Sequence, residues 1–334
     1  MSPPLAALFC PGRGSYAREE LGFLRRHLRP GPVADALAEA DAERKASGQP
    51  SITELDGADR FRPGLHLDGE NAAALIYFST LAHVEHLRER YRIELVAGNS
   101  LGWYTALAAA GALSPAAGWR LVSTMARLQK GIPGGQILTT TVDEAWRRDP
   151  SAAAAVREAL DATNAKGEAF FVARSIRLGG HEVLAGTEAG IRHLLGVLPR
   201  MKVGERDFPF QLAGHGPFHT RLCQPTSDRA AVELASLPMT APVPYLVDGL
   251  GNIHSPWSAD PSELLSYTVT TQVTETYDFT AAVRTAIREF NPEILLCAGP
   301  GASLRAPVGH VAIAEGYRGL ADRNALFESQ LVSV

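Results

Sequence analysis

Short apolar runs alternate with longer amphipathic segments along most of the chain. Runs bounded by glycine, proline or polar residues predict buried strands, and we expect strands at 5–9, 93–97, 137–142, 169–173, 182–185, 208–212, 244–248 and 293–297. In the amphipathic segments the apolar residues recur three or four positions apart, as at Leu75, Phe78 and Leu81. That spacing predicts helices at 17–30, 71–88, 101–110, 120–129, 151–162, 188–198 and 279–289, with a further helix after His219.

The order of these elements predicts the fold class. Strands that alternate with helices favour an α/β core with parallel strands. The pattern of expected elements changes at residue 136: from there to about residue 207, short strands are interleaved with two helices. We therefore expect a large domain formed by 1–135 and 208–334, with the small α+β subdomain 136–207 inserted between its halves.

Composition narrows the classes of protein. The chain has 334 residues, 46% of them hydrophobic and 20% charged, with a formal net charge of −4. A nucleic-acid-binding protein would normally show a basic excess, so we expect no nucleic-acid partner. No apolar run approaches the roughly 20 residues that span a bilayer, so no membrane partner is expected either. The cysteines Cys10, Cys223 and Cys297 lack metal-ligand spacing, which predicts no metal site and favours a reduced, cytoplasmic setting.

Residues 93–111 carry the main chemical signal. The expected strand 93–97 runs into Gly98-Asn99-Ser100-Leu101-Gly102, and a helix follows. This is the G-x-S-x-G pattern of a nucleophile elbow, in which a sharp strand-to-helix turn exposes the serine hydroxyl. Small neighbours on both sides permit the strained backbone, and the first amides of the helix face whatever the serine attacks. The alternative, an incidental glycine turn, stays open at this point.

Two further glycine-rich loops follow expected strands. One is Cys10-Pro11-Gly12-Arg13-Gly14-Ser15, and the other contains Gly299-Pro300-Gly301. Their glycines permit close approach of the backbone to a ligand. A phosphate-binding P-loop would end in Lys-Ser or Lys-Thr, which the first loop lacks.

With these motifs in hand, the chain resembles the malonyl-CoA:acyl-carrier-protein transacylase family, which includes the acyltransferase domains of fatty-acid and polyketide synthases. The segments PGRGS (11–15), GNSLGWYTALAAAGALS (98–114), GPFHTRL (216–222) and AGPGASL (298–304) match family motifs in order, over nearly the full length. The resemblance implies an α/β-hydrolase-like core with a parallel sheet and an inserted ferredoxin-like subdomain.

The resemblance also implies roles for individual residues. Ser100 would be the nucleophile and His219 its general base, because an alcohol attacks at neutral pH only when a base removes its proton. His215, four positions earlier, is the competing base, and a purely structural role for His219 is the other alternative. The backbone amides of Arg13 and Leu101 would form the oxyanion hole.

A backbone carbonyl orients the histidine in the family. The matching position falls near Asp278, whose carboxylate would add support or simply cap a helix. Phe218, next to His219, is expected to contact the substrate.

Several positions depart from the family pattern. Counting from Ser100, the arginine that pairs with the malonyl carboxylate falls on Met125, and Arg127 faces away from it on a straight helix. Substitutions at further substrate-binding positions also indicate a remodelled pocket: Asn99 replaces a histidine, Trp103 a glutamate, Asn71 a glutamine and Arg13 the loop glutamine.

Two hypotheses explain Met125. Either the acyl group carries no carboxylate, which we favour because methionine is apolar, or Arg13 supplies the positive charge from the other side of the pocket. A third hypothesis is that the ungapped count is off by a residue or two and that Met125 is simply a core residue.

The expected function is therefore acyl transfer, in fatty-acid or polyketide biosynthesis, from acyl-CoA or another acyl carrier protein to the phosphopantetheine arm of an acyl carrier protein. No bound cofactor is expected, since both thioesters are substrates. A hydrolase that releases stalled acyl groups and a catalytically silent scaffold are the alternatives. Arg25, Arg26 and Arg29 are candidates for docking the acidic carrier protein.

Overall fold

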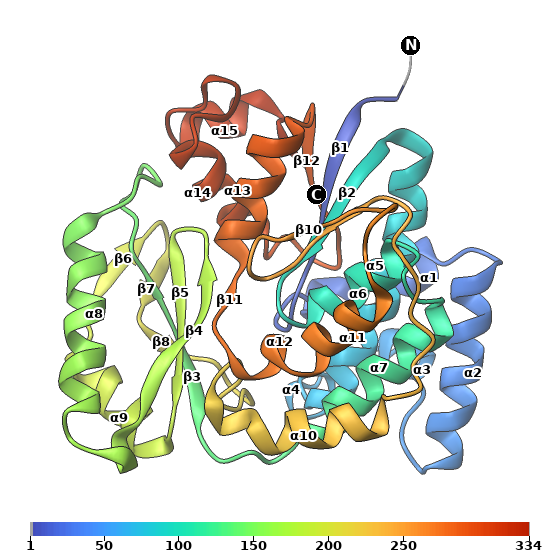
Figure 1. Cartoon of the computed structure of the whole chain (residues 1–334), viewed down its shortest axis with the longest axis horizontal. Helices are drawn as coiled ribbons and strands as arrows, with labels where there is room; N and C mark the ends of the chain where they lie inside the picture. Colours follow the sequence, from blue (N-terminus) through green and yellow to red (C-terminus); the bar gives the residue numbers. More distant parts are fainter. Residues whose placement is uncertain (1–2, 334) are drawn as a thin grey trace.

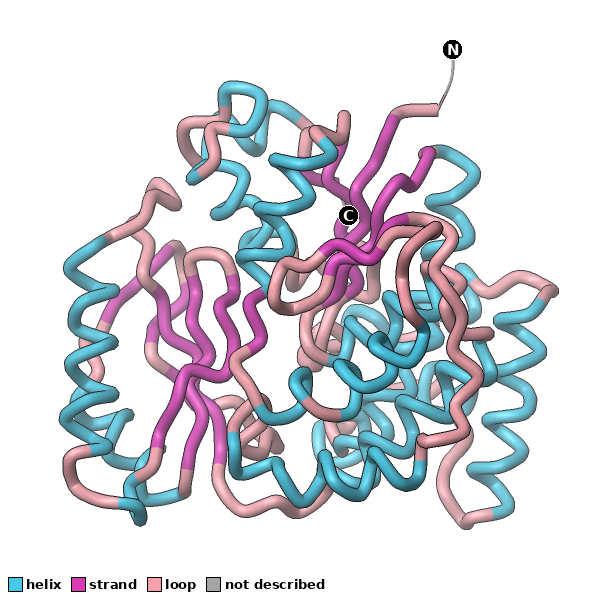
Figure 2. Tube along the Cα trace, in the orientation of Figure 1, coloured by secondary structure: helices cyan, strands magenta, loops and turns pink. Residues whose placement is uncertain are grey.

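A computed structural model describes residues 3–333 and contains a six-stranded sheet, a five-stranded sheet and a two-stranded hairpin, with helices packed around them (Figures 1 and 2). The larger sheet has the order β10-β9-β2-β1-β12-β13. At its centre β1 (Leu5–Cys10) pairs in parallel with β2 (Arg92–Gly98) and β12 (Ile294–Cys297). On one side β9 (Tyr245–Val247) pairs in parallel with β2, and the edge strand β10 (Ile253–His254) is antiparallel to β9. On the other side β13 (Val332–Ser333) pairs in parallel with β12. The predicted α/β core with parallel strands is confirmed.

Helices cover both faces of this sheet because its central strands are apolar on both sides; residues 6–10 of β1 are fully buried. The helices of this part are α1 (Phe23–His27), α2 (Pro32–Ala46), α3 (Ile52–Asp56), α4 (Pro63–His66), α5 (Gly69–Arg90), α6 (Leu101–Ala109), α7 (Pro115–Leu128), α10 (Gln224–Glu233), α11 (Pro261–Val269), α12 (Thr271–Thr274), α13 (Phe279–Phe290), α14 (Arg305–Ala314) and α15 (Arg323–Ser329). Within residues 3–333, none of the helices is long and apolar enough to cross a bilayer.

The smaller sheet has the order β11-β4-β5-β3-β8. Its strands are β3 (Gly135–Thr140), β4 (Val172–Leu178), β5 (His181–Gly186), β8 (Phe210–Gln211) and β11 (Tyr277–Asp278). With α8 (Pro150–Asn164) after β3 and α9 (Glu188–Val197) after β5, the chain order β3-α8-β4-β5-α9-β8 is that of a ferredoxin-like unit. A hairpin of β6 (Met201–Val203) and β7 (Arg206–Phe208) precedes β8.

The small sheet draws on residues outside the segment 136–207. Strand β8 pairs with β3, and β11 joins in parallel to β4. The helices α8 and α9 cover its outer face over Ile137, Val156 and Leu184, while α13 lies toward the other face (Figure 1). The segment between β8 and α10, which contains His219, therefore leaves the small sheet directly.

Some predicted elements differ from those observed. The predicted helix 17–30 contains a 3-10 turn (Arg18–Glu20) and the short α1, because Gly22 adopts a left-handed φ of 76° between them. The predicted strand 169–173 begins instead as a 3-10 turn, Glu168–Phe170, and β4 starts at Val172. The long helix α2 was not predicted, although Pro32 in its first turn and its Ala/Glu-rich sequence are ordinary helix signals.

Candidate active site

Ser100 lies at the sharp turn between β2 and α6. Its backbone has φ 57° and ψ −113°, a combination that residues other than glycine rarely adopt. The turn is possible because its neighbours lack side chains. A Cβ on Gly102 would lie 2.1 Å from the carbonyl oxygen of Cys10, and one on Gly98 would lie 2.0 Å from that of Gly102. The predicted elbow geometry is present.

The structure brings Ser100 and His219 together. Ser100 Oγ and His219 Nε2 are 2.7 Å apart, although 119 positions separate the two residues in the sequence. On the other side of the ring, Nδ1–H donates to the backbone carbonyl of Gln272 in α12, at 2.6 Å. Because a carbonyl only accepts, this bond places the proton on Nδ1 and leaves Nε2 free to accept the serine proton.

Burial controls the protonation state of this imidazole. It lowers the pKa of His219 to about 4; the hydrogen bond to Gln272 opposes the shift, and the positive charge of Arg13 adds to it. The ring is therefore neutral at pH 7, as a general base requires.

The group that orients His219 differs from the prediction. Asp278 does not contact His219: its carboxylate caps α13 through the amide of Ala281 and pairs with Arg177. The carbonyl implied by the resemblance is present, but Gln272, six positions earlier, provides it. Sequence reasoning missed Gln272 because a backbone carbonyl has no residue signature.

The side chain of Gln272 adds a second link to the elbow. Its Nε2 donates to the carbonyl of Ser100 at 3.3 Å, and its Oε1 accepts from the hydroxyl of Tyr104 at 2.8 Å. Gln272 thus contacts His219 through its backbone carbonyl and Ser100 through its side-chain amide.

Asp278 gives a prediction on stability. Asp278→Ala should lower the free energy of unfolding by about 1 kcal/mol through loss of the α13 cap, while Ser100 keeps its rate of reaction with a fluorophosphonate. Asp278→Asn should restore the stability, since asparagine caps equally well. Urea unfolding and intact mass measure the two effects. A fall in Ser100 reactivity in the asparagine variant would contradict this assignment.

A small cavity of about 30 Å³ adjoins Ser100 and His219. Besides Ser100 and His219, four predicted site residues line it: Arg13 from the loop after β1, Leu101 from α6, Met125 from α7, and Phe218. Met125 is buried and faces the nucleophile, so the ungapped count from Ser100 reaches a pocket position. Arg127 faces away and pairs with Glu233, as predicted.

Arg13 is the principal charged group of this cavity. Its guanidinium carbon lies 4.4 Å from the centre of the Phe218 ring, and burial lowers the pKa of Arg13 to about 10, so the side chain is charged at pH 7. Nη2 is buried and has no hydrogen-bond partner among residues 3–333. The negative charge of Asp68 opposes that pKa shift, but it makes no hydrogen bond to Nη2, and a buried donor without an acceptor is costly unless a ligand supplies one.

Three other predicted substrate-binding residues lie outside the lining of this cavity. Trp103 is fully buried behind α6, where its Nε1 donates to Thr268 Oγ1 at 3.0 Å. Asn71 accepts a hydrogen bond from Arg44 and donates to a backbone carbonyl. Asn99 is buried against Gly12. None of the three lines the cavity at Ser100, and their contact with the acyl group stays a prediction.

The two residues whose amides are expected to form an oxyanion hole, Arg13 and Leu101, both line this cavity. Leu101 is the first residue of α6, so its N–H has no acceptor within the helix, and both Leu101 and Arg13 line the cavity beside Ser100. His215, the competing base, does not contact Ser100: its Nδ1 bonds Gln136 Oε1 at 2.9 Å. Burial lowers the pKa of His215 to about 3.

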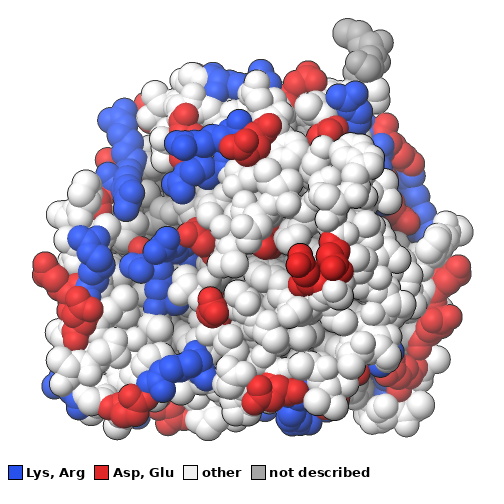
Figure 3. All heavy atoms as spheres, viewed as in Figure 1, with Lys and Arg blue, Asp and Glu red and all other residues white. Residues whose placement is uncertain are grey.

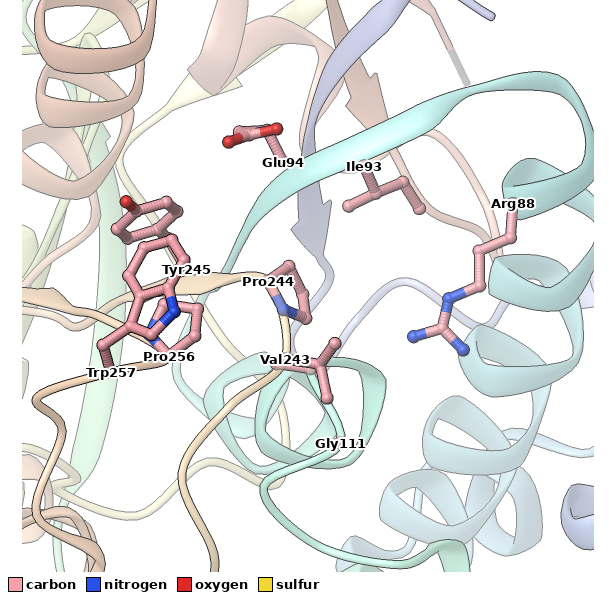
Figure 4. Close-up of a pocket in the computed structure, with 10 residues that line it drawn as sticks. Arg88, Ile93, Glu94, Gly111, Val243, Pro244, Tyr245, Pro256 and Trp257 are labelled. Carbon is pink, nitrogen blue, oxygen red and sulfur yellow. The ribbon is translucent and has the colours of Figure 1, made fainter.

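Larger hollows lie elsewhere. One of about 530 Å³ contains Arg88, Glu94 and Trp257 at the opposite end of β2 from Ser100, and no nucleophile–base pair lines it (Figure 4). A second, also of about 530 Å³, begins at His219 and runs along β4 past Arg174, Arg177 and Arg221. A third, of about 340 Å³, lies beyond Arg13 and includes His215. Access to Ser100 is therefore flanked by a groove on the His219 side and by a chamber on the Arg13 side.

Comparison with known proteins gives a structural match only. No protein-family model matches the chain, and the search of curated proteins finds no match. Among solved structures, the acyl-carrier-protein S-malonyltransferase of Burkholderia pseudomallei is similar, with a TM-score of 0.74, 24% identity, and 98% of this chain and 99% of that one covered.

Two further structures agree. The malonyl-CoA:acyl carrier protein transacylase of Xanthomonas oryzae has a TM-score of 0.72 and 22% identity, over 93% of this chain and 92% of that one. The malonyl-CoA:ACP transacylase of Synechocystis has a TM-score of 0.73 and 19% identity, over 97% and 99%. At these identities the likeness establishes the fold, so the chain, over nearly its whole length, has the fold of the malonyl-CoA:acyl carrier protein transacylases.

Proposed function

We propose that the protein is an acyltransferase that moves an acyl group from an acyl thioester to the phosphopantetheine arm of an acyl carrier protein, through an ester on Ser100. The observation that carries the proposal is the 2.7 Å contact between Ser100 Oγ and His219 Nε2 at a strained elbow. Solved proteins of this fold named as malonyltransferases support the choice of reaction.

The chemistry balances in two steps. Ser100 Oγ attacks the thioester carbonyl while its proton passes to His219 Nε2, and the amides of Leu101 and Arg13 bind the developing oxyanion. The intermediate then expels the thiolate, which takes the proton from His219 and leaves acyl-Ser100. In the second step the carrier-protein thiol gives its proton to His219, its sulfur attacks the ester, and Ser100 Oγ takes the proton back.

The position of His219 orients the thioester arm. His219 protonates the leaving sulfur, so that sulfur and the attached arm lie on the side of His219, where the groove along β4 begins. Arg174, Arg177 and Arg221 line this groove, each paired with a carboxylate (Glu182, Asp278 and Glu168 in turn). Figure 3 shows Lys and Arg side chains gathered over the half of the molecule that contains the small sheet. Arg25, Arg26 and Arg29 line neither this groove nor the cavity at Ser100, so we place docking of the acidic carrier protein at the groove.

The acyl group then points toward Arg13 and Met125. Met125 by itself favours an uncharged group, the preference we drew from the sequence. The buried Nη2 of Arg13, with no partner among the described residues, supports the other hypothesis, and we propose that Arg13 binds a terminal carboxylate.

Arg13→Gln tests the acyl group. It removes the charge but keeps the backbone amide, so loading of malonyl from malonyl-CoA should fall by about 10²-fold, while loading of acetyl should not fall. Intact mass of the Ser100 adduct measures both rates, and Arg127→Gln, on the outer side of α7, is the matched control. An unchanged ratio of malonyl to acetyl loading would contradict carboxylate binding by Arg13 and favour an uncharged acyl group instead.

The same assay tests the reaction class. An adduct that is stable alone and is lost when a holo acyl carrier protein is added supports transfer. Free acid that accumulates without an acceptor would show hydrolysis instead. No adduct and no turnover with any thioester would overturn the enzymatic proposal in favour of a scaffold.

The low pKa of His219 predicts the pH dependence. The base is active when neutral, that is, above its pKa of about 4, so the rate of Ser100 acylation at low substrate concentration should stay level from pH 8 to about pH 5 and fall below that. Short pH-jump assays with rapid quenching measure the rate, with circular dichroism as the check on folding. A midpoint near 6.5, the ordinary value for histidine, would contradict the burial argument.

A further inference from the structure

We propose that Ser175 and Gln136, both from the small sheet, are positioning residues that hold the backbone of His219 in its working conformation. The proposal depends on the proposed function only in taking His219 as the base for Ser100. It assigns to the small subdomain a direct part in the catalytic geometry of the large one.

The need for such support comes from the conformation of His219. Its φ is 56°, in the left-handed region that costs a residue other than glycine roughly 1–2 kcal/mol. The ring is fixed at one end by the carbonyl of Gln272. The other end of the ring contacts Ser100 Oγ at 2.7 Å. These two bonds hold the imidazole, and the carbonyl of Phe218 must be held by other contacts.

Ser175 and Gln136 make those contacts. Ser175 Oγ donates to the carbonyl of Phe218 at 2.8 Å, and Gln136 Nε2 approaches the same oxygen at 3.5 Å. Gln136 Nε2 also donates to Ser175 Oγ at 2.7 Å. All of these groups are buried, so no solvent competes for the bonds.

A β-bulge in β4 positions the side chain of Ser175. Arg174 pairs with Leu184 and Ile176 pairs with Val183, so Ser175 is an extra residue between consecutive pairs of the ladder. A bulge of this kind re-aims a side chain, and such bulges occur often beside active sites. Here the hydroxyl meets the carbonyl that precedes the catalytic histidine.

The network continues to the chamber beyond Arg13. Gln136 Oε1 accepts from His215 Nδ1 at 2.9 Å, which fixes the orientation of the Gln136 amide, since its Nε2 must then face Ser175. His215 lines that chamber together with Arg13. The chain of bonds therefore runs from the acyl side of the site to the backbone of His219.

The test measures Ser100 reactivity with a fluorophosphonate probe, in which the serine oxygen bonds to phosphorus, fluoride leaves, and the proton passes to His219. This readout needs neither a thioester nor a carrier protein. Ser175→Ala should lower the rate about tenfold or more, because small displacements of a catalytic group cost that much. Ser175→Thr, which keeps the hydroxyl, should recover most of it.

Thr163→Ala is the matched control. Thr163 is a buried hydroxyl of α8 in the same subdomain and donates to a backbone carbonyl at 2.6 Å, but it has no link to His219. It should lose stability without loss of probe rate. Equal losses of rate in the Ser175→Ala and Thr163→Ala variants, in step with their melting temperatures, would reduce Ser175 to a structural role and overturn the proposal. So would a wild-type rate in Ser175→Ala.

Failure of the proposed function gives a different pattern. If the unaltered protein reacts with the probe but with no thioester, acyl transfer is wrong, and the Ser175 comparison still decides the positioning role. If the unaltered protein does not react with the probe at all, His219 does not activate Ser100 and both proposals fall.

Discussion

Ser100→Ala is expected to give a folded protein that forms no acyl adduct and transfers acyl groups at least 10³-fold more slowly than the unaltered chain. The alanine removes the only atom that forms the ester, and the remaining oxyanion donors give little turnover without it. His219→Ala should lose nearly as much, because the two residues act as one unit and their effects do not add. Transfer of a radiolabelled acyl group to holo acyl carrier protein measures all three rates.

Ser123→Ala is the control for this experiment. Ser123 lies on α7, and among residues 3–333 its hydroxyl bonds only the carbonyl of Arg120 within the same helix. This variant should transfer at the rate of the unaltered protein. Persistence of an adduct on another residue in the Ser100→Ala protein would show that the nucleophile lies elsewhere, and the elbow would then be an incidental turn.

The sequence predicted the parts of this site that depend on residue type. The G-x-S-x-G pattern is recognisable without an alignment, and its glycines have a physical reason: Gly98 and Gly102 allow the close backbone contacts of the elbow. His219 and Phe218 were found by their motif, and Met125 by counting along two helices without gaps. Parallel strands were predicted from apolar runs because burial on both faces excludes polar residues.

The parts that failed depend on backbone groups and on distant packing. Every residue has a backbone carbonyl, so residue type could not identify Gln272 as the acceptor for His219. Alignment with the family motif pointed to Asp278 instead, which caps α13. The strands β8 and β11 are two residues each, too short for an alternating pattern to show. The sequence does not show which way the Trp103 side chain points. That orientation follows from the packing of α6 against Tyr267.

The pocket shows how the two kinds of information combine. The sequence places an arginine at 13 and a methionine at 125, and two opposite hypotheses about charge follow. Only the structure shows that the Arg13 side chain shares one cavity with Met125 and Ser100 and leaves Nη2 without a partner among the described residues. That juxtaposition is why we favour a carboxylated acyl group over the preference drawn from the sequence.

Gly102→Ala is expected to cost at least about 3 kcal/mol of unfolding free energy and to abolish acylation in whatever fraction stays folded. The new Cβ would lie 2.1 Å from the carbonyl oxygen of Cys10 and 2.8 Å from that of Pro11. Both are backbone atoms at the end of the central strand, so α6 must move away from the loop that holds Arg13. The two amides proposed for the oxyanion hole would then separate.

Gly196→Ala provides the opposite expectation within the same chain. Gly196 lies in α9, and apart from the adjacent backbone of α9 no atom of the described residues lies within 4 Å of a Cβ placed there. Alanine should therefore stabilise the helix by up to about 1 kcal/mol. Urea unfolding of both variants, together with the fluorophosphonate rate at Ser100, separates a general glycine effect from the elbow contact. If Gly102→Ala unfolds at the urea concentration of the unaltered protein, the close packing of α6 on the Cys10 loop is wrong, and the oxyanion assignment to Arg13 and Leu101 loses its structural basis.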